Sequence, residues 1–457
     1  MSYEFRIIGK KKLTEYFKQL IILNSSFIIF LSSCSVQTQI AKSAKADVLD
    51  TEALQTAHIG ITIFDPAANK YLYNYQGDKY IVPASNIKIP TCYAAMKYLG
   101  DSLSGALISE NDTSILMIPT GDPTLLHPDF KINRLIDYLQ KQPKSIYIAD
   151  KNWEEDGLGS GWSWNDYNNN YMAERSPMPV YGNVIKWIQE IDDSTKPSFI
   201  YSVPEVNWTV NFADDKKNKN FDVIRNIGTN VFTLHQGTEK KLEKSVPFFT
   251  NGLQATIELL EEHLHKQVFL LKDNQIQALK DSFKPIHSQP TDSLLKPMMH
   301  RSDNFFAEQS LLMVSNERLG VMNDEKIIDT LLKTDFIDLP QKPRWVDGSG
   351  LSRYNLFTPQ DFVAILNKMK NEFGMERLKV ILPTGGEGTI SSYYKADSGY
   401  IYGKTGTLSG VVAFSGFLYT KKGKLLIFST LINNHQASST EVRKAIEKFI
   451  QGVRNKF

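Results

Sequence analysis

Residues 83–100 read PASNIKIPTCYAAMKYLG, and they decide most of what can be inferred about the fold around them. After Pro83 the segment is largely apolar and ends at Gly100, which predicts a helix with Ser85 at or near its N-terminus. There the serine hydroxyl and its own N–H lie at the positive end of the helix dipole, where a developing oxyanion is favoured. Lys88 follows one turn later and can reach the serine oxygen. The segment therefore indicates a nucleophilic Ser85 with a lysine base; the plainer alternative is an ordinary N-cap serine.

The spacing Ser-x-x-Lys is weak by itself, because it occurs three times in the chain. The other two pairs are Ser293/Lys296 and Ser392/Lys395. Pro297 directly follows Lys296, and the residue before a proline is disfavoured in helical conformation. Neither of these pairs is expected to have a helix that holds the lysine over the serine.

Two more short strings follow in order, Ser302-Asp303-Asn304 and Lys404-Thr405-Gly406. A phosphate-binding loop is a rival interpretation of the second string, but that motif requires a glycine where this chain has Ser398, and a helix after the Lys-Thr pair. The apolar run after Lys404-Thr405-Gly406 predicts a strand instead. On a strand edge, the lysine and threonine side chains can bind a substrate carboxylate while the backbone pairs with an extended peptide. Thr407 can offer its backbone N–H to an oxyanion; a surface turn is the plainer alternative.

The composition is that of an ordinary globular protein. Its 457 residues suggest about two or three domains. Lys+Arg 52 against Asp+Glu 50 leaves a net charge of +2, which gives no electrostatic case for nucleic acid. No histidine or cysteine pattern is typical of a metal site, so we expect neither a metal nor another cofactor.

The N-terminus predicts an exported protein. A basic start precedes an apolar run over residues 20–31 that is too short to span a bilayer comfortably. The string Leu31-Ser32-Ser33-Cys34 resembles a bacterial lipoprotein cleavage box, in which residues 1–33 are removed and Cys34 carries a lipid. An ordinary signal peptide or a poor membrane helix is the alternative. Residues 34–52 read as a flexible tether, and Cys92 as a core residue without chemistry.

The two ends of the remaining chain predict one domain that is interrupted by a long insertion. The expected strands are residues 57–64, 70–75, 400–405, 411–419 and 425–432, and helices are expected to begin near residues 85, 305, 359 and 438. The signals over residues 101–295 are mixed, with strands expected over 207–212 and 230–234 and helices over 185–191 and 252–265. We therefore expect a discontinuous catalytic domain, residues 53–100 plus 296–457, and one or two inserted domains over 101–295.

The ordered strings resemble those of the penicillin-recognising serine acyltransferases, a group that includes the β-lactamases. More narrowly, the chain resembles the D-alanyl-D-alanine carboxypeptidase/endopeptidase family, the class C type low-molecular-mass penicillin-binding proteins. The strings that carry this narrower resemblance are PASN at 83–86, GDPT at 121–124, GWSW at 161–164 and DGSGLSR at 347–353. It implies an α+β fold, a transpeptidase-like domain with an antiparallel sheet flanked by helices and a large inserted domain.

The same resemblance implies a role for each matching residue. Ser85 would attack the carbonyl of a D-Ala-D-Ala bond, and a neutral Lys88 would take its proton. The backbone N–H groups of Ser85 and Thr407 would stabilise the oxyanion, and Ser302 would relay a proton to the leaving amine. The implied substrate-binding residues are Asn304, Lys404, Thr405, Gly406 and Thr407, with Trp162, Trp164, Asp166 and Tyr171 as candidates for the stem-peptide pocket.

The leading hypothesis is a penicillin-sensitive serine D,D-peptidase that acts on peptidoglycan stem peptides. It would be anchored through Cys34 on the periplasmic face of the bacterial cell envelope, with β-lactams as covalent inhibitors. A non-catalytic cell-wall binding protein is one alternative, although it does not require Lys88 beside Ser85. A β-lactamase is another, but we find no glutamate motif for fast deacylation. Removal of terminal D-alanine and cleavage of cross-links both stay open.

Overall fold

The central sheet joins the two ends of the chain. The structure is a computed structural model that describes residues 36–191, 198–213, 219–271 and 283–457. The strand order of the sheet is β14-β15-β16-β1-β2, and neighbouring strands are antiparallel. The strands are β1 (His58–Asp65), β2 (Lys70–Tyr75), β14 (Ile401–Leu408), β15 (Val411–Tyr419) and β16 (Leu425–Asn433). All five strands predicted for the two ends are confirmed, and β1 pairs with β16 across the long middle region.

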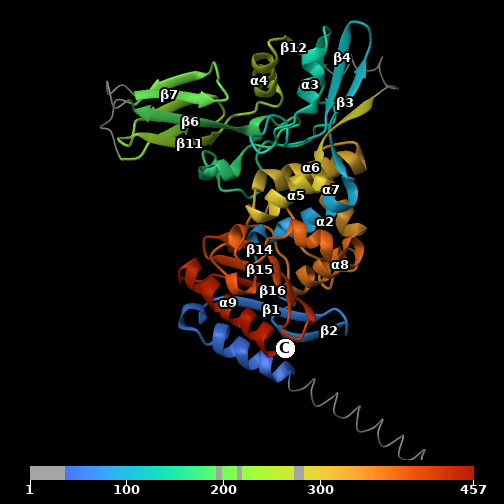
Figure 1. The fold of residues 1–457 in the computed structure, drawn as a ribbon, viewed down its shortest axis with the longest axis vertical. Helices are drawn as coiled ribbons and strands as arrows, with labels where there is room; N and C mark the ends of the chain where they lie inside the picture. The colour runs from blue at the N-terminus through green and yellow to red at the C-terminus, as the bar shows by residue number, and fades with distance from the viewer. Residues whose placement is uncertain (1–35, 192–197, 214–218, 272–282) are drawn as a thin grey trace, which may run out of the picture.

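Helices cover both faces of this sheet (Figure 1). Successive strand residues point to opposite faces, so Ala413 and Phe414 of β15 belong to two different cores. The helices that enclose the core on the Ala413 side are α2 (Lys88–Tyr98), α5 (Thr291–His300), α6 (Asn304–Leu319), α7 (Asp324–Lys333) and α8 (Pro359–Ile381). On the Phe414 side lie α9 (Ser439–Lys456) and an N-terminal helical segment. The predicted α+β class, an antiparallel sheet flanked by helices, is confirmed.

Capping boxes begin two of these helices. The Thr358 hydroxyl accepts a hydrogen bond from the Asp361 N–H, and the Asp361 carboxylate accepts one from the Thr358 N–H. Ser438 and Glu441 exchange the same pair of bonds before α9. Each box binds N–H groups that have no partner within the helix. The predicted starts of both helices are therefore confirmed.

A separate set of sheets and helices lies between residues 102 and 290, at the top of Figure 1. One sheet has the order β12-β5-β4-β3-β13, a second β11-β6-β7, and a third β8-β10-β9. Their strands are β3 (Ser102–Glu110), β4 (Ser114–Pro119), β5 (Ser145–Ile148), β6 (Val184–Ile191), β7 (Ser198–Val203), β8 (Thr209–Phe212), β9 (Asp222–Arg225), β10 (Val231–His235), β11 (Lys241–Pro247), β12 (Val268–Leu270) and β13 (Lys284–Pro290). With α3 (Arg134–Lys141) and α4 (Gln254–Leu264) they enclose a core of their own.

The sequence predicted this inserted region unevenly. The helix expected over 252–265 is confirmed as α4, and the strands expected over 207–212 and 230–234 are confirmed as β8 and β10. The helix expected over 185–191 is wrong, because those residues form β6, which pairs with β7 on one side and β11 on the other. Its valine, isoleucine and tryptophan side chains suit a strand. The expected boundary at residue 295 falls inside α5, which packs in the catalytic core.

The predicted tether over residues 34–52 is wrong where it is described. Residues 36–49 are helical. Ile40, Ala44 and Val48 are buried, and their spacing of four places them in one stripe that packs with α9. Asp47 also pairs with Lys448 of α9, with 2.9 Å between the charged atoms. The polar composition suggested a tether, but the apolar spacing decides the structure.

The predicted leader, residues 1–33, and the lipidation site Cys34 lie outside the described residues. Among the residues that are described, no helix is long and apolar enough to cross a membrane. Cys92 is a free, buried thiol on α2, as expected for a core residue.

Candidate active site

The predicted nucleophile and base lie one turn apart. A short 3-10 helix, residues Ala84–Ile87, carries Ser85 and leads into α2, which begins at Lys88. The Lys88 Nζ atom lies 3.0 Å from the Ser85 Oγ atom. Lys88 is buried, whereas Ser85 is partly exposed and lines a cleft. The helix N-terminus thus brings a hydroxyl into the cleft and keeps an amine behind it.

The two rival Ser-x-x-Lys pairs lie elsewhere on the surface. Contrary to the expectation, Ser293 and Lys296 are on a helix, because α5 continues through Pro297. Both side chains are exposed, as are Ser392 and Lys395. None of these four residues lines the cleft that contains Ser85.

Lys88 makes two further hydrogen bonds that fix its orientation. Its Nζ atom lies 2.6 Å from Asn304 Oδ1 and 2.7 Å from the carbonyl oxygen of Ser349. The amide of Asn304 is itself oriented, because its Nδ2 donates to the carbonyl of Tyr171. Both oxygens can only accept, so a neutral Lys88 directs its two N–H groups to them. The remaining lone pair of the amine then faces the hydroxyl of Ser85.

Burial favours this neutral form of Lys88. It lowers the pKa of the ammonium to about 8, although the nearby carboxylates of Asp347, Glu308 and Asp303 raise the pKa and partly oppose the effect. An amine with a pKa near working pH can take up a proton and still be neutral in a large fraction of molecules.

A second lysine, Lys404 of β14, is buried behind Ser302. Lys404 Nζ lies 2.9 Å from Ser302 Oγ and 2.7 Å from the carbonyl oxygen of Thr405. Burial, and then the charge of Lys88, lower the pKa of Lys404 well below its usual value. Ser302 has a φ of 61°, and Ala84, next to the nucleophile, has a φ of 47°. Such left-handed backbone costs about 1–3 kcal/mol per residue and is concentrated at functional sites.

Strand β14 is the edge strand of the sheet beside Ser85. It is the outermost strand of the sheet, and the Gly403 N–H points away from β15 to bond the Pro383 carbonyl. Alternate residues of an antiparallel strand point the same way, so the N–H of Thr407 faces the same open edge. A Cβ on Gly406 would lie 2.6 Å from the Pro83 carbonyl oxygen. Glycine therefore permits the close approach that brings this edge to the N–H of Ser85.

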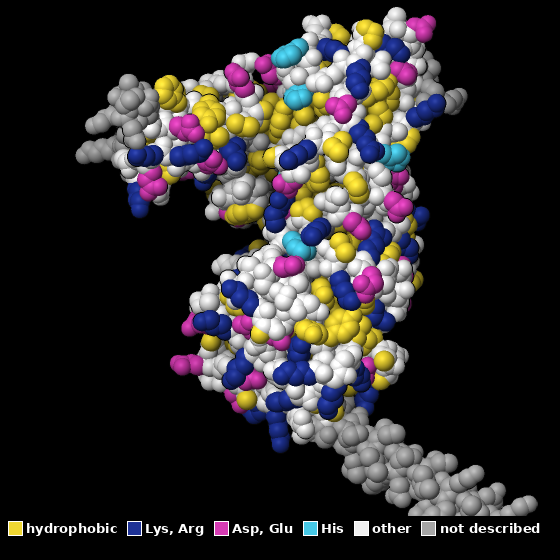
Figure 2. Space-filling view, viewed as in Figure 1, with side chains coloured by type: hydrophobic (Ala, Val, Ile, Leu, Met, Phe, Trp, Pro, Cys, Tyr) yellow, Lys and Arg dark blue, Asp and Glu magenta, His cyan; other side chains and the backbone are white. Residues whose placement is uncertain are grey.

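The cleft lies between the catalytic part and a loop of the inserted region. In Figure 2 the molecule is hollowed between the arm of β6, β7 and β11 and the part below it. The cleft has a volume of about 780 Å³, and residues from both sides line it: Ser85, Gly161, Ser163, Asn165, Asp166, Tyr171, Met172, Ser302, Asn304, Gly350, Leu351, Arg353, Thr407, Leu408 and Ser409. The structure thus brings two predicted pocket residues, Asp166 and Tyr171, to the cleft. It does not bring Trp162 and Trp164 there.

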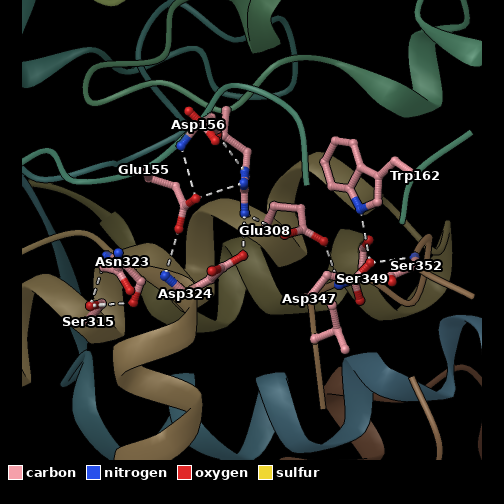
Figure 3. Close-up of polar contacts among 12 residues, drawn as sticks. Glu155, Asp156, Trp162, Glu308, Ser315, Asn323, Asp324, Asp347, Ser349 and Ser352 are labelled. Atoms are coloured by element: carbon pink, nitrogen blue, oxygen red, sulfur yellow. Dashed lines mark hydrogen bonds and ion pairs between the residues drawn. The ribbon is translucent and has the colours of Figure 1, made fainter. Parts of the chain in front are cut away.

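The indole of Trp162 serves a buried turn instead. Its Nε1 donates to Asp347 Oδ2 at 3.0 Å (Figure 3), whereas Trp164 is 76% exposed. Asp347 also accepts bonds from the N–H groups of Gly350 and Ser352. This turn holds the Ser349 carbonyl, so the string at 347–353 supports the base directly.

The sequence did not predict two other side chains near the site. Arg443 of α9 donates to Thr407 Oγ1 at 2.6 Å, and Glu308 of α6 accepts from the N–H of Ser349 at 2.7 Å. The only sequence signal for Glu308 is its position four residues after Asn304, on the same helix face. Arg443 lies far from the three strings in the chain and gave no signal. In the described ranges, no three metal-ligating side chains are grouped to hold an ion.

Comparison with known proteins shows the family to which this chain belongs. A family model described as the D-Ala-D-Ala carboxypeptidase 3 (S13) family matches residues 40–453. The chain belongs to this family. As an S13 member it is a serine-type peptidase, and the family resemblance expected from the strings is confirmed.

Other S13-type proteins are distant but similar along almost the whole chain. The D-alanyl-D-alanine carboxypeptidase DacB of Haemophilus influenzae is 24% identical, over 96% of this chain and 98% of the relative. The D-alanyl-D-alanine carboxypeptidase of Actinomadura sp. (strain R39) is 24% identical, over 85% and 80%. The crystal structure of penicillin binding protein 4 from H. influenzae has a TM-score of 0.69 at 22% identity, covering 91% and 98%. The penicillin G acylated Bd3459 endopeptidase of Bdellovibrio bacteriovorus has a TM-score of 0.50 at 13% identity, covering 88% and 93%.

Proposed function

We propose that this S13 peptidase cleaves D-alanyl bonds in peptidoglycan stem peptides through an acyl-enzyme on Ser85. The lone pair of neutral Lys88 takes the hydroxyl proton while Oγ bonds to the substrate carbonyl carbon. The C–N bond to the leaving residue then breaks, and the proton that Lys88 took up passes through Ser302 to the leaving nitrogen, which returns Lys88 to its neutral form. Water hydrolyses the ester and restores the serine.

The observation that carries this proposal is the set of three contacts made by Lys88. Asn304 Oδ1 and the Ser349 carbonyl are acceptors only, so the lone pair faces Ser85. Burial of the amine is a cost that a protein which only binds cell wall has no reason to maintain. This contrast favours an enzyme over a binding protein.

The substrate carbonyl and backbone fit the edge of β14. The N–H of Ser85 belongs to the first turn of a helix, so it has no partner within that helix. Together with the N–H of Thr407 it would bind the oxyanion. Asn304 and Gly406 would hold the peptide against the edge. Thr405 would contribute its hydroxyl, which at present bonds Thr389 Oγ1 at 2.7 Å.

The charge that binds the substrate carboxylate would come from Arg443. Burial disfavours the ammonium form of Lys404, so this lysine is a poor source of positive charge. Arg443 brings a guanidinium group that contacts Thr407 and makes no ion pair with a carboxylate among the described residues. Replacing Arg443 by leucine is therefore expected to raise KM for a D-Ala-D-Ala peptide about tenfold or more, with a smaller change in kcat. Steady-state release of D-alanine measures both.

Lys444 supplies the matched control for this variant. It is the next residue of α9 and is exposed, so Lys444→Leu removes one positive charge without touching Thr407. We expect Lys444→Leu to keep the native KM. A peptide with a C-terminal amide should not distinguish Arg443→Leu from the wild type. An unchanged KM for the free-acid peptide in Arg443→Leu would exclude this role.

The proposed activity is tested with the purified protein and two substrates. Release of D-alanine from a pentapeptide reports carboxypeptidase action, and digestion of cross-linked muropeptides reports endopeptidase action. Penicillin should form an adduct with a lifetime of minutes or longer. Fast loss of the adduct with net hydrolysis of penicillin would indicate a β-lactamase. Binding of muropeptides with no adduct and no cleavage would indicate a binding protein.

We also propose that the protein acts on the periplasmic face of the bacterial envelope, anchored by a lipid on Cys34. The box Leu31-Ser32-Ser33-Cys34 supports this. The catalytic unit would consist of residues 53–100 and the C-terminal part from 296, together with the helix over 36–49 and the whole of α5, and the region between its two parts would be inserted. β-Lactams would acylate Ser85. Mass spectrometry of the mature N-terminus tests the lipid directly.

A further inference from the structure

A buried carboxylate lies one helical turn from Asn304, the residue that contacts the base Lys88. Glu308 of α6 is 1% exposed and lies one turn after Asn304. Its Oε1 accepts a hydrogen bond of 2.7 Å from the N–H of Ser349. The carbonyl of Ser349 in turn accepts a bond of 2.7 Å from Lys88 Nζ. Two side chains of one helix face thus reach the base, Asn304 by direct contact and Glu308 through one residue of the turn.

The turn at residues 348–350 lies between Glu308 and Lys88 and has little room to move. A Cβ on Gly348 would lie 2.8 Å from the carbonyl oxygen of Ala307, and one on Gly350 would lie 1.9 Å from the carbonyl oxygen of Ala84. The turn is therefore pressed between α6 on one side and the backbone that precedes Ser85 on the other. A shift of Ser349 toward or away from Glu308 moves the carbonyl that orients the amine.

The second oxygen of Glu308 faces the inserted region. Arg175 places its NH1 atom 3.7 Å from Glu308 Oε2 and is 1% exposed. The same guanidinium bonds Asp324 at 2.6 Å and Glu155 at 3.0 Å (Figure 3). The guanidinium also lies over the ring of Trp162, with 5.5 Å between the Arg175 Cζ atom and the ring centroid. Arg175 and Trp162 come from one connecting segment of the inserted region. Arg175 reaches Glu308, and Trp162 reaches Asp347 in the turn that contains Ser349 (Figure 3).

We infer that Glu308 is a positioning residue for the base: it holds the Ser349 carbonyl so that the lone pair of Lys88 stays on Ser85, and Arg175 holds Glu308 in place. This inference rests on the proposed function. Glu308 does not line the cleft, and therefore acts on acylation without touching the substrate. Through Arg175, a loop of the inserted region contributes to the rate of a reaction on the catalytic sheet.

The charged groups around Glu308 determine how the pH profile should respond. Arg175 faces it from the inserted loop, Asp324 and Glu155 lie beyond that guanidinium, and Asp347 and Lys88 lie across the turn. Burial and the charge of Asp347 raise the pKa of Glu308 to about 8, and Arg175 opposes this effect. An ionised Glu308 raises the pKa of Lys88. Where Glu308 is ionised, removal of its charge therefore lowers the pKa of the amine.

The test compares Glu308→Ala and Glu308→Gln by the rate constant of acylation with a fluorescent penicillin, measured from pH 5 to 10. Glu308→Ala deletes the acceptor for Ser349 and is expected to slow acylation about tenfold or more on the plateau above the acidic limb, without weaker initial binding of penicillin. Glu308→Gln keeps an acceptor of the same size but no charge. It should recover most of the rate and shift the acidic limb of the profile to lower pH.

Glu317→Gln is the matched control, because this glutamate lies on the same helix and is exposed. Its acylation rate and pH profile should be native. A native rate in Glu308→Ala, even with a lower melting temperature, overturns the inference, as does a glutamine variant with an unshifted acidic limb. If the alanine variant does not fold, the profile of Glu308→Gln decides alone. Failure of the wild type to be acylated at Ser85 would instead refute the proposed function.

Discussion

Replacing Ser85 by alanine is expected to abolish covalent labelling by penicillin. The acyl group forms an ester on Oγ, and this is the only atom that the substitution removes from the site. Lys88, Asn304 and Ser349 keep their mutual contacts, so the variant should fold and should still bind a D-Ala-D-Ala peptide without cleaving it. Gel fluorescence with a labelled penicillin, together with intact-protein mass, measures the adduct.

The rival serines supply matched controls for this experiment. Ser293 and Ser392 share the Ser-x-x-Lys spacing but are exposed and lie away from the cleft. Ser293→Ala and Ser392→Ala should label as fully as the wild type. An adduct of the same mass in Ser85→Ala would contradict the assignment, and peptide mapping would then locate the true nucleophile.

The second large effect is expected for Lys88→Met, which keeps the length of the side chain and removes the amine. Loss of a general base typically slows a reaction by about 10²–10⁴-fold, and we expect acylation to slow by this order. The methionine fits a site that is already buried, so the thermal unfolding temperature should change little by comparison. Stopped-flow or quenched labelling gives the rate constant.

The pH profile separates loss of the base from a general disturbance. Lys88 must be neutral to accept a proton, so wild-type acylation should rise with pH through the pKa of about 8 and level off above it. In Lys88→Met this acidic limb should disappear. Lys296→Met, at an exposed lysine of the same spacing, should keep both the rate and the limb. A limb that persists in Lys88→Met would assign it to another group.

The two ends of the chain could be predicted because their signals are local. A capping box needs only Ser438 and Glu441, three residues apart, and the contact of Ser85 with Lys88 needs only one helical turn. The same locality explains the failures. Residues 185–191 could not be recognised as a strand without β7 and β11 beside them, and residues 36–49 look polar until α9 covers their apolar stripe.

The support of the site could not be predicted for the same physical reason. Arg175 and Asp324 are separated by 149 residues, and Arg443 and Thr407 by 36. Such contacts depend on the tertiary fold, which no spacing along the chain records. The three sequence motifs identified the side chains that would react. The side chains that orient them, or that add positive charge beside them, could be recognised only from the three-dimensional structure.

With the proposed lipid on Cys34, the helix over residues 36–49 would keep the enzyme close to the membrane. A flexible spacer would let a lipid-anchored enzyme search the wall far above the membrane. Here the proposed anchor at Cys34 is two positions in the sequence before residue 36, where the described helix packed on α9 begins. The height of the cleft above the membrane would then be set by the folded body itself. Such an enzyme would process only the layer of peptidoglycan that passes within about one molecular length of the lipid surface.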